Sequence, residues 1–164
     1  MSIRYSSQLR ESDCGPISIF NLLKWIGIRV NLRDHHRLLC NLCNDSPEFG
    51  SSEQELTRAL SKIKKRIKFN FSYIKSPNRN NIIKHLKAGG AAILFFQNET
   101  GIHACFMPSI ETEREIILIN AFDDETKSVL TKAAFLKLTK IRPIRVWLIE
   151  KINQPHLPRQ KSAR

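Results

Sequence analysis

The stretch that most constrains the fold is residues 17–26, because its apolar side chains leave almost no polar face. At about 3.6 residues per turn they cover most of a helix circumference, and only a strip around Asn21 and Lys24 stays polar. The apolar positions are Ile17, Ile19, Phe20, Leu22, Leu23, Trp25 and Ile26. Such a helix is stable only when other elements cover it on nearly every side. We therefore expect a central, buried helix that ends at Gly27.

Cys14 stands just ahead of this helix and is followed by Gly15 and Pro16. Proline is favoured at the first helical position, so Cys14 is expected among unpaired N–H groups at the positive end of the helix dipole. Both effects favour the thiolate, which is the nucleophilic form. Gln8 precedes Cys14 by six residues, and its side-chain amide and the Cys14 backbone N–H can supply two donors to an oxyanion. Taken alone, the same residues also fit a turn with a small buried cysteine.

The rest of the chain divides into a helical half and a strand-rich half. Apolar periodicity predicts helices at residues 32–43, 53–65 and 78–88, and Ser52 with Glu55 forms a capping box. Apolar or alternating runs predict strands at residues 69–74, 91–97, 102–109, 115–122 and 144–152, with a helix at residues 132–139 before the last strand. This order indicates an α+β fold whose helical N-terminal half packs on a mostly antiparallel C-terminal sheet.

The length and the two ends of the chain favour one domain. Its 164 residues suffice for a single core, which we place at residues 1–152, and the basic tail at residues 153–164 is expected to be disordered. No run of about 18 apolar residues predicts a membrane span, and residues 1–7 lack the apolar block of a signal peptide. Four cysteines do not form a disulfide framework here. We therefore expect the reducing cytoplasm, with secretion by a signal-independent route as the alternative.

The charge balance is strongly basic, with 27 Lys and Arg residues against 15 Asp and Glu residues and a net charge of +12. This excess favours an acidic protein or an anionic surface as a partner, although it also serves solubility alone. A basic cluster at residues 62–68 lacks interleaved aromatic residues and a known binding motif, so we do not expect nucleic acid as the partner.

His36, Cys40 and Cys43 follow one another at helical spacing and raise the question of a metal site. Only three ligands are visible, whereas a structural zinc site takes four. We interpret them instead as two half-buried thiols and a boundary histidine, beside an inward face formed by Leu38, Leu39 and Leu42. We expect neither a metal nor a cofactor.

His103 and Asn120 are candidates for the two residues that would assist Cys14 in nucleophilic catalysis. His103 lies early in one predicted strand and Asn120 ends the next, and hairpin-connected strands can bring such residues together. A thiolate on a helix, an imidazole on a strand and an amide or carboxylate on the adjacent strand are the parts of a nucleophile–base–orienter triad. Separately, His103 fits a core histidine and Asn120 fits a turn residue, but the joint arrangement with Cys14 and Gln8 favours a site.

These residues make the sequence resemble the C39 group of papain-like cysteine peptidases. The matching segments are Gln8, residues 11–16 (Glu-Ser-Asp-Cys-Gly-Pro), residues 101–104 (Gly-Ile-His-Ala) and the strands at 116–120 and 146–149. The resemblance spans about residues 8–151 and implies a papain-like fold. It also implies that Cys14 is the nucleophile, His103 the base and then the acid, Asn120 the orienter and Gln8 the oxyanion donor. The group usually has Asp at the position of Asn120, so Asp123 and Asp124 are alternative third members.

We therefore expect a cysteine peptidase that acts on a peptide or protein substrate. The best-known members of the resembled group cut peptide leaders after two glycines. The same thiol chemistry can instead transfer an acyl group or deamidate glutamine, depending on whether an amine or water enters. A further alternative is a non-catalytic basic binding module on the same fold, which would have no need of Gln8, Cys14 and His103 together.

Overall fold

The computed structural model describes residues 3–46, 50–97, 102–112, 114–122, 125–140 and 144–152, with the backbone alone at residues 11, 121, 122, 125 and 140. The helical elements are η1 (Glu11–Asp13), α1 (Cys14–Ile26), α2 (Leu32–Cys43), α3 (Glu53–Lys64), α4 (Arg79–Lys87) and α5 (Lys132–Lys140). The strands are β1 (Phe69–Lys75), β2 (Ala91–Gln97), β3 (Ile102–Met107), β4 (Glu115–Phe122), β5 (Glu125–Thr131) and β6 (Ile144–Lys151). Within the described ranges, every helix is too short or too polar to cross a membrane.

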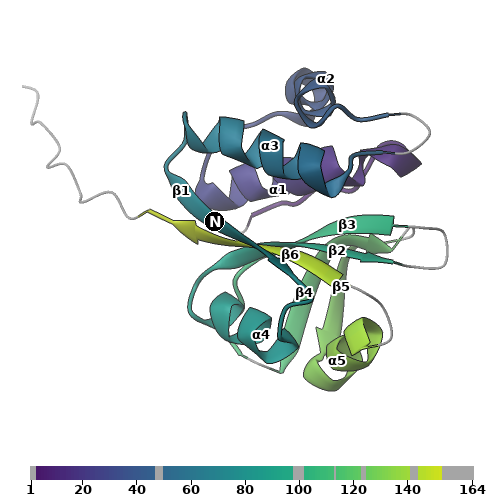
Figure 1. Ribbon diagram of the computed structural model, residues 1–164, viewed down its shortest axis with the longest axis vertical. Helices are drawn as coiled ribbons and strands as arrows, with labels where there is room; N and C mark the ends of the chain where they lie inside the picture. Colours follow the sequence, from purple (N-terminus) through teal and green to yellow (C-terminus); the bar gives the residue numbers. More distant parts are fainter. Residues whose placement is uncertain are drawn as a thin grey trace, which may run out of the picture.

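The strands form one antiparallel sheet of six strands in the order β1-β6-β2-β3-β4-β5. Helices α1, α2 and α3 lie on one side of this sheet, and α4 and α5 lie on the other (Figure 1). The expected α+β papain-like architecture, with a helical first half packed on an antiparallel sheet, is therefore confirmed.

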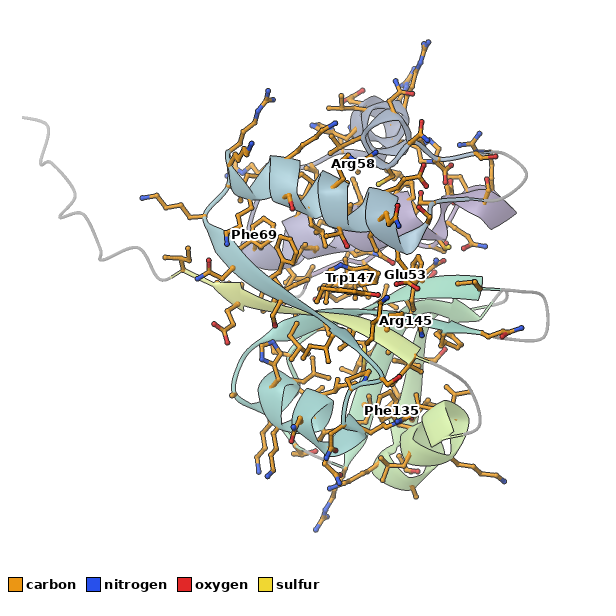
Figure 2. All side chains as sticks on the ribbon, viewed as in Figure 1. Glu53, Arg58, Phe69, Phe135, Arg145 and Trp147 are labelled. Carbon is orange, nitrogen blue, oxygen red and sulfur yellow. The ribbon has the colours of Figure 1, made fainter. Side chains whose placement is uncertain are left out.

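Two apolar clusters hold these layers together, one on each face of the sheet. Alternation along β2 sends Ile93 and Phe95 toward α1, and Leu94 and Phe96 toward α4 and α5. Trp147 packs on the α1 side, where its Nε1 atom donates to the Thr57 hydroxyl of α3 at 2.9 Å. Figure 2 shows Trp147 between α3 and the sheet, with Phe135 on the far side.

Helix α1 is as buried as its sequence requires, because it lies between α2 and strands β3 and β4. It begins at Cys14 and ends at Gly27, whose φ of 101° is readily adopted only by glycine. The capping box of α3 is also present, since the Ser52 N–H donates to Glu55 and the Glu55 N–H donates to the Ser52 hydroxyl. Local sequence signals thus set the helix ends.

Two sequence expectations about the packing were wrong. Strand β5 was not expected, because its mostly exposed side chains at the edge of the sheet give little apolar signal. In α2, Leu38 is 62% exposed, whereas Leu39, Cys40 and Cys43 are buried. Neighbouring helix positions differ by about 100°, and the inward stripe runs through residues 39, 40 and 43 rather than through Leu38. The two thiols are therefore core residues rather than half-buried ones.

Candidate active site

Cys14 is the first residue of α1 and is 8% exposed. The backbone N–H of Ala104, on β3, donates to its Sγ atom at 3.4 Å. Burial raises the pKa of the Cys14 thiol to about 11, although the Ala104 and Gly15 N–H groups act in the opposite direction. The helix N-terminus therefore stabilises the thiolate as expected, but its effect is smaller than the desolvation that the sequence did not reveal.

His103, on β3, is buried and precedes the residue that contacts Cys14. Its Nε2 atom lies 2.5 Å from the backbone carbonyl oxygen of Asn120, on the neighbouring strand β4. A carbonyl oxygen only accepts hydrogen bonds, so Nε2 carries a proton and Nδ1 is the basic nitrogen of the neutral ring. The Phe96 ring packs against the imidazole at a centroid distance of 5.9 Å, which restricts its rotation.

The backbone carbonyl of Asn120 that contacts His103 lies at an irregularity in β4. Its φ is 60°, in the left-handed region that asparagine tolerates better than most residues, and the β4–β5 register shifts between Ile119 and Phe122. Its side chain pairs with Gln8 in both directions. The Gln8 backbone N–H donates to Asn120 Oδ1 at 2.8 Å, and Asn120 Nδ2 donates to Gln8 Oε1 at 3.0 Å.

The structure thus joins Gln8, Asn120 and His103 in one hydrogen-bonded chain and sets Cys14 against the residue after His103. The contact to the imidazole comes from the main-chain carbonyl of Asn120, not from the side-chain amide that the sequence suggested. Asp123 and Asp124, the alternative third members, lie outside the described residues.

Asp13 lies directly before Cys14 and was not singled out from the sequence. Its side chain is fully buried and accepts hydrogen bonds from the backbone N–H groups of Leu9 and Arg10. These contacts tie the segment after Gln8 to the residue before Cys14. A carboxylate directly ahead of a helix-opening cysteine is the signal that could have revealed it.

A small recess of about 70 Å³ adjoins this site, and two of its lining residues, Phe96 and Ile102, flank His103. Its walls combine apolar side chains with the ion pair of Arg145 and Glu53, whose Nε and Oε1 atoms lie 2.9 Å apart. Glu53 and Arg145 face each other between α3 and the sheet (Figure 2). Across the described part of the chain, no three His, Cys, Asp or Glu side chains gather closely enough to hold a metal ion.

Comparison with solved structures identifies the fold. The peptidase domain of Streptococcus ComA, a bifunctional ABC transporter involved in quorum sensing, aligns with a TM-score of 0.64 and 14% identity, covering 92% of this chain and 100% of that domain. A double glycine motif protease from an AMS/PCAT transporter, solved in complex with the leader peptide, aligns with a TM-score of 0.61 and 14% identity, covering 92% and 93% of the two chains.

A structure described as a C39-like peptidase from Bacillus anthracis aligns with a TM-score of 0.57 and 10% identity, covering 93% of this chain and 96% of that one. No protein-family model matches the sequence, and no curated protein matches it. The likeness therefore rests on the three-dimensional arrangement of nearly the whole domain. The chain has the papain-like α+β fold of C39 peptidase domains.

Proposed function

We propose that this chain is a cysteine peptidase in which Cys14 is the nucleophile, His103 the base and Gln8 an oxyanion donor. The proposal is supported by two observations in a peptidase-like fold: the Cys14 sulfur contacts the Ala104 N–H beside His103, and hydrogen bonds link Gln8, Asn120 and His103. Cys14 opens the buried helix against β3, and the Gln8–Asn120 pair ends on the imidazole of His103. A binding module would not require these polar groups to meet beside a buried thiol.

The contacts of His103 support the following sequence of proton transfers. We propose that His103, whose Nε2–H is bonded to the Asn120 carbonyl, accepts the Cys14 proton as Sγ attacks the substrate carbonyl carbon. The imidazolium then protonates the departing amine, leaving a thioester on Cys14. His103 next takes a proton from the water that attacks the thioester. It returns this proton to Sγ as the C–S bond breaks, which releases the carboxylic acid and restores the thiol.

The rise of the Cys14 pKa to about 11 bears on this scheme. At neutral pH the resting residue is a thiol, so proton transfer to His103 accompanies attack rather than preceding it. Asn120 Nδ2 donates to the Oε1 atom of Gln8, so this hydrogen bond does not involve the Nε2–H groups of Gln8. Those donors, with the Cys14 backbone N–H, are proposed to stabilise the oxyanion.

The substrate we propose is a peptide with small residues at the cleavage point. Of the structural neighbours, one is a double glycine motif protease solved with a leader peptide, which supports testing such sequences first. The recess beside His103 holds about 70 Å³, enough for one short apolar side chain, and we propose that it receives a substrate residue next to the scissile bond.

The test is cleavage of quenched fluorescent peptides that contain Gly-Gly followed by varied residues. Wild type should cleave them, and Cys14→Ala and His103→Ala should not. Mass spectrometry of the products separates hydrolysis from acyl transfer and glutamine deamidation, which give different masses. Equal product formation by wild type and Cys14→Ala would overturn the proposal.

A further inference from the structure

Asp13 holds both ends of the segment that carries the proposed site. Its Oδ1 atom accepts from the backbone N–H groups of Leu9 at 3.2 Å and Arg10 at 3.3 Å. Gln8 directly precedes this pair, and Cys14 directly follows Asp13. A small movement of the carboxylate would therefore shift the oxyanion donor and the nucleophile relative to each other.

A buried carboxylate is stable only when further groups pair with it. Asp13 has no exposed side-chain surface, and its Oδ2 atom lies 2.5 Å from Nε2 of His36, a residue of α2 that is 18% exposed. The imidazole is thus the side chain that completes the hydrogen bonding of Asp13. It also connects α2, a helix that contributes none of the proposed reacting groups, to the start of α1.

The charged surroundings of this pair come from two further segments. Arg10 Nη2 lies 3.4 Å from Asp45 Oδ2 and 3.4 Å from the Cys40 sulfur, and Cys40 lies 3.6 Å from His36 Nε2. Both Asp45 and Asp13 raise the pKa of the Cys14 thiol through their negative charge. Asp13 therefore acts on the proposed nucleophile in two ways, through its negative charge and through the backbone that it holds in place.

We propose that His36 is a positioning residue for the peptidase site, which it serves by fixing the Asp13 carboxylate that aligns Gln8 with Cys14. The inference rests on the proposed function, since the groups aligned are the nucleophile and the oxyanion donor. His36 itself touches no proposed reacting atom. His36 would influence the proposed site only by fixing the Asp13 side chain and the hydrogen bonds that this side chain accepts.

The experiment compares His36→Phe, His36→Gln and Asp13→Asn with His35→Gln as a matched control. His35 is the neighbouring histidine of α2, and its Nδ1 atom contacts the Asn31 carbonyl at 2.9 Å, away from Asp13. In His36→Phe, kcat for Gly-Gly peptides should fall on the order of 10²-fold, the effect of a small misplacement, with KM nearly unchanged. His36→Gln should recover most of the loss because its amide N–H can replace Nε2–H. His35→Gln should match wild type.

The double variant Asp13→Asn/His36→Phe tests whether His36 acts through Asp13. Its loss should equal that of Asp13→Asn alone, because His36 then has no carboxylate to hold. Additive losses would overturn the proposal, as would a His36→Phe enzyme with wild-type kcat. Circular dichroism on every variant shows whether a loss comes from unfolding, and His36→Ala replaces His36→Phe if the latter does not fold.

A second readout separates this inference from the proposed function. The rate at which an epoxysuccinyl probe labels Cys14 requires no substrate, and it should fall in His36→Phe and recover in His36→Gln. If wild type cleaves no peptide but labelling follows this order, the peptidase function fails and the positioning role stands. If wild type cleaves peptides and labelling is the same in all variants, the positioning role fails.

Discussion

Cys14 and Cys40 each contact a segment that carries a histidine, yet their settings differ. Cys14 opens α1, with the Ala104 N–H on its sulfur and His103 immediately before Ala104 on β3. Cys40 lies inside α2, with its sulfur 3.6 Å from His36 Nε2 and 3.4 Å from Arg10 Nη2. Burial raises the pKa of both thiols. Proximity to a histidine therefore does not by itself distinguish a nucleophile.

The difference lies in what surrounds each sulfur. At Cys14 the N–H groups of Gly15 and Ala104 lower the thiol pKa, and Gln8 is within the same hydrogen-bonded chain as His103. Beside Cys40, the Nε2 atom of His36 is instead hydrogen-bonded to the buried carboxylate of Asp13, 2.5 Å from Oδ2. We therefore assign the proposed nucleophile to Cys14, whose sulfur accepts from a backbone N–H, and a structural role to Cys40 and His36.

The largest expected effect separates the two thiols directly. Cys14→Ala should lower kcat/KM for peptide cleavage by about 10⁴-fold or more, because the nucleophile is lost. Cys40→Ser should change it by less than about tenfold, since no proposed reacting group is removed. Steady-state assays on both variants check this comparison. A Cys40→Ser enzyme as inactive as Cys14→Ala would remove the distinction.

The next largest effect concerns Gln8. Gln8→Ala should lower kcat by about 10²- to 10³-fold, the usual result of removing one oxyanion donor. Gln8→Glu is the matched variant, because it keeps an oxygen able to accept from Asn120 Nδ2 but offers no N–H to the oxyanion. Both variants should lose similar activity. If Gln8→Glu keeps wild-type kcat, Gln8 serves only to anchor Asn120.

A smaller effect is expected at Asn120, because His103 contacts its main-chain carbonyl, which every substitution keeps. Asn120→Ala should lower kcat by about tenfold through the lost Gln8 contacts, and also lower stability by roughly 1–2 kcal/mol, because alanine adopts a φ of 60° poorly. Asn120→Asp should be tolerated. Thermal denaturation and kcat measure the two effects separately.

Asp123→Ala and Asp124→Ala test which residue is the third member of the proposed catalytic triad. If Asn120 fills that role, both aspartate variants should retain more activity than Asn120→Ala. An aspartate variant that loses activity while Asn120→Ala keeps it would move the role of orienter to residues 123–124.

The last expected effect is on stability at alkaline pH and not on activity. The folded Cys14 thiol has a pKa of about 11, whereas an unfolded thiol ionises near about 8.5. Between these values the folded state holds more protons, so the free energy of unfolding falls as pH rises, by about 1.4 kcal/mol per pH unit for one thiol. This stabilisation is fully present below about pH 8.5 and lost as the pH passes about 11.

Urea denaturation at several pH values measures this dependence, with Cys14→Ser as the control. Serine does not ionise in this range, so its free energy of unfolding should fall less steeply with pH than that of wild type. Equal slopes would show that the Cys14 pKa is the same in the folded and unfolded states, and would remove the role assigned to burial.

Local signals in the sequence account for much of the fold. The apolar run after Pro16 predicted the buried helix, and the Ser52–Glu55 capping box and Gly27 set helix ends where the structure has them. Strand β5 could not be predicted in this way, because an exposed edge strand has few buried apolar residues.

The sequence could propose candidate site residues but not their contacts. Motif spacing pointed to Gln8, Cys14, His103 and Asn120, but the contacts that define them link residues far apart in sequence. Ala104 and Cys14 are 90 positions apart, and the Ala104 N–H lowers the pKa of the thiol that burial raises. The φ of 60° at Asn120, which turns its carbonyl to His103, also arises from the bulge in β4 rather than from a residue pattern.

The measurement that tests the central claim most directly is the order in which the four thiols react. A limiting amount of an epoxysuccinyl or iodoacetamide probe is added to the native protein at neutral pH, and the modified residue is mapped by mass spectrometry. All four cysteines are buried and free of disulfides, so exposure alone does not favour one of them. Cys14 should be modified first, and His103→Ala should slow that reaction without changing the labelling of Cys40. Modification of Cys40, Cys43 or Cys105 ahead of Cys14 would contradict the account.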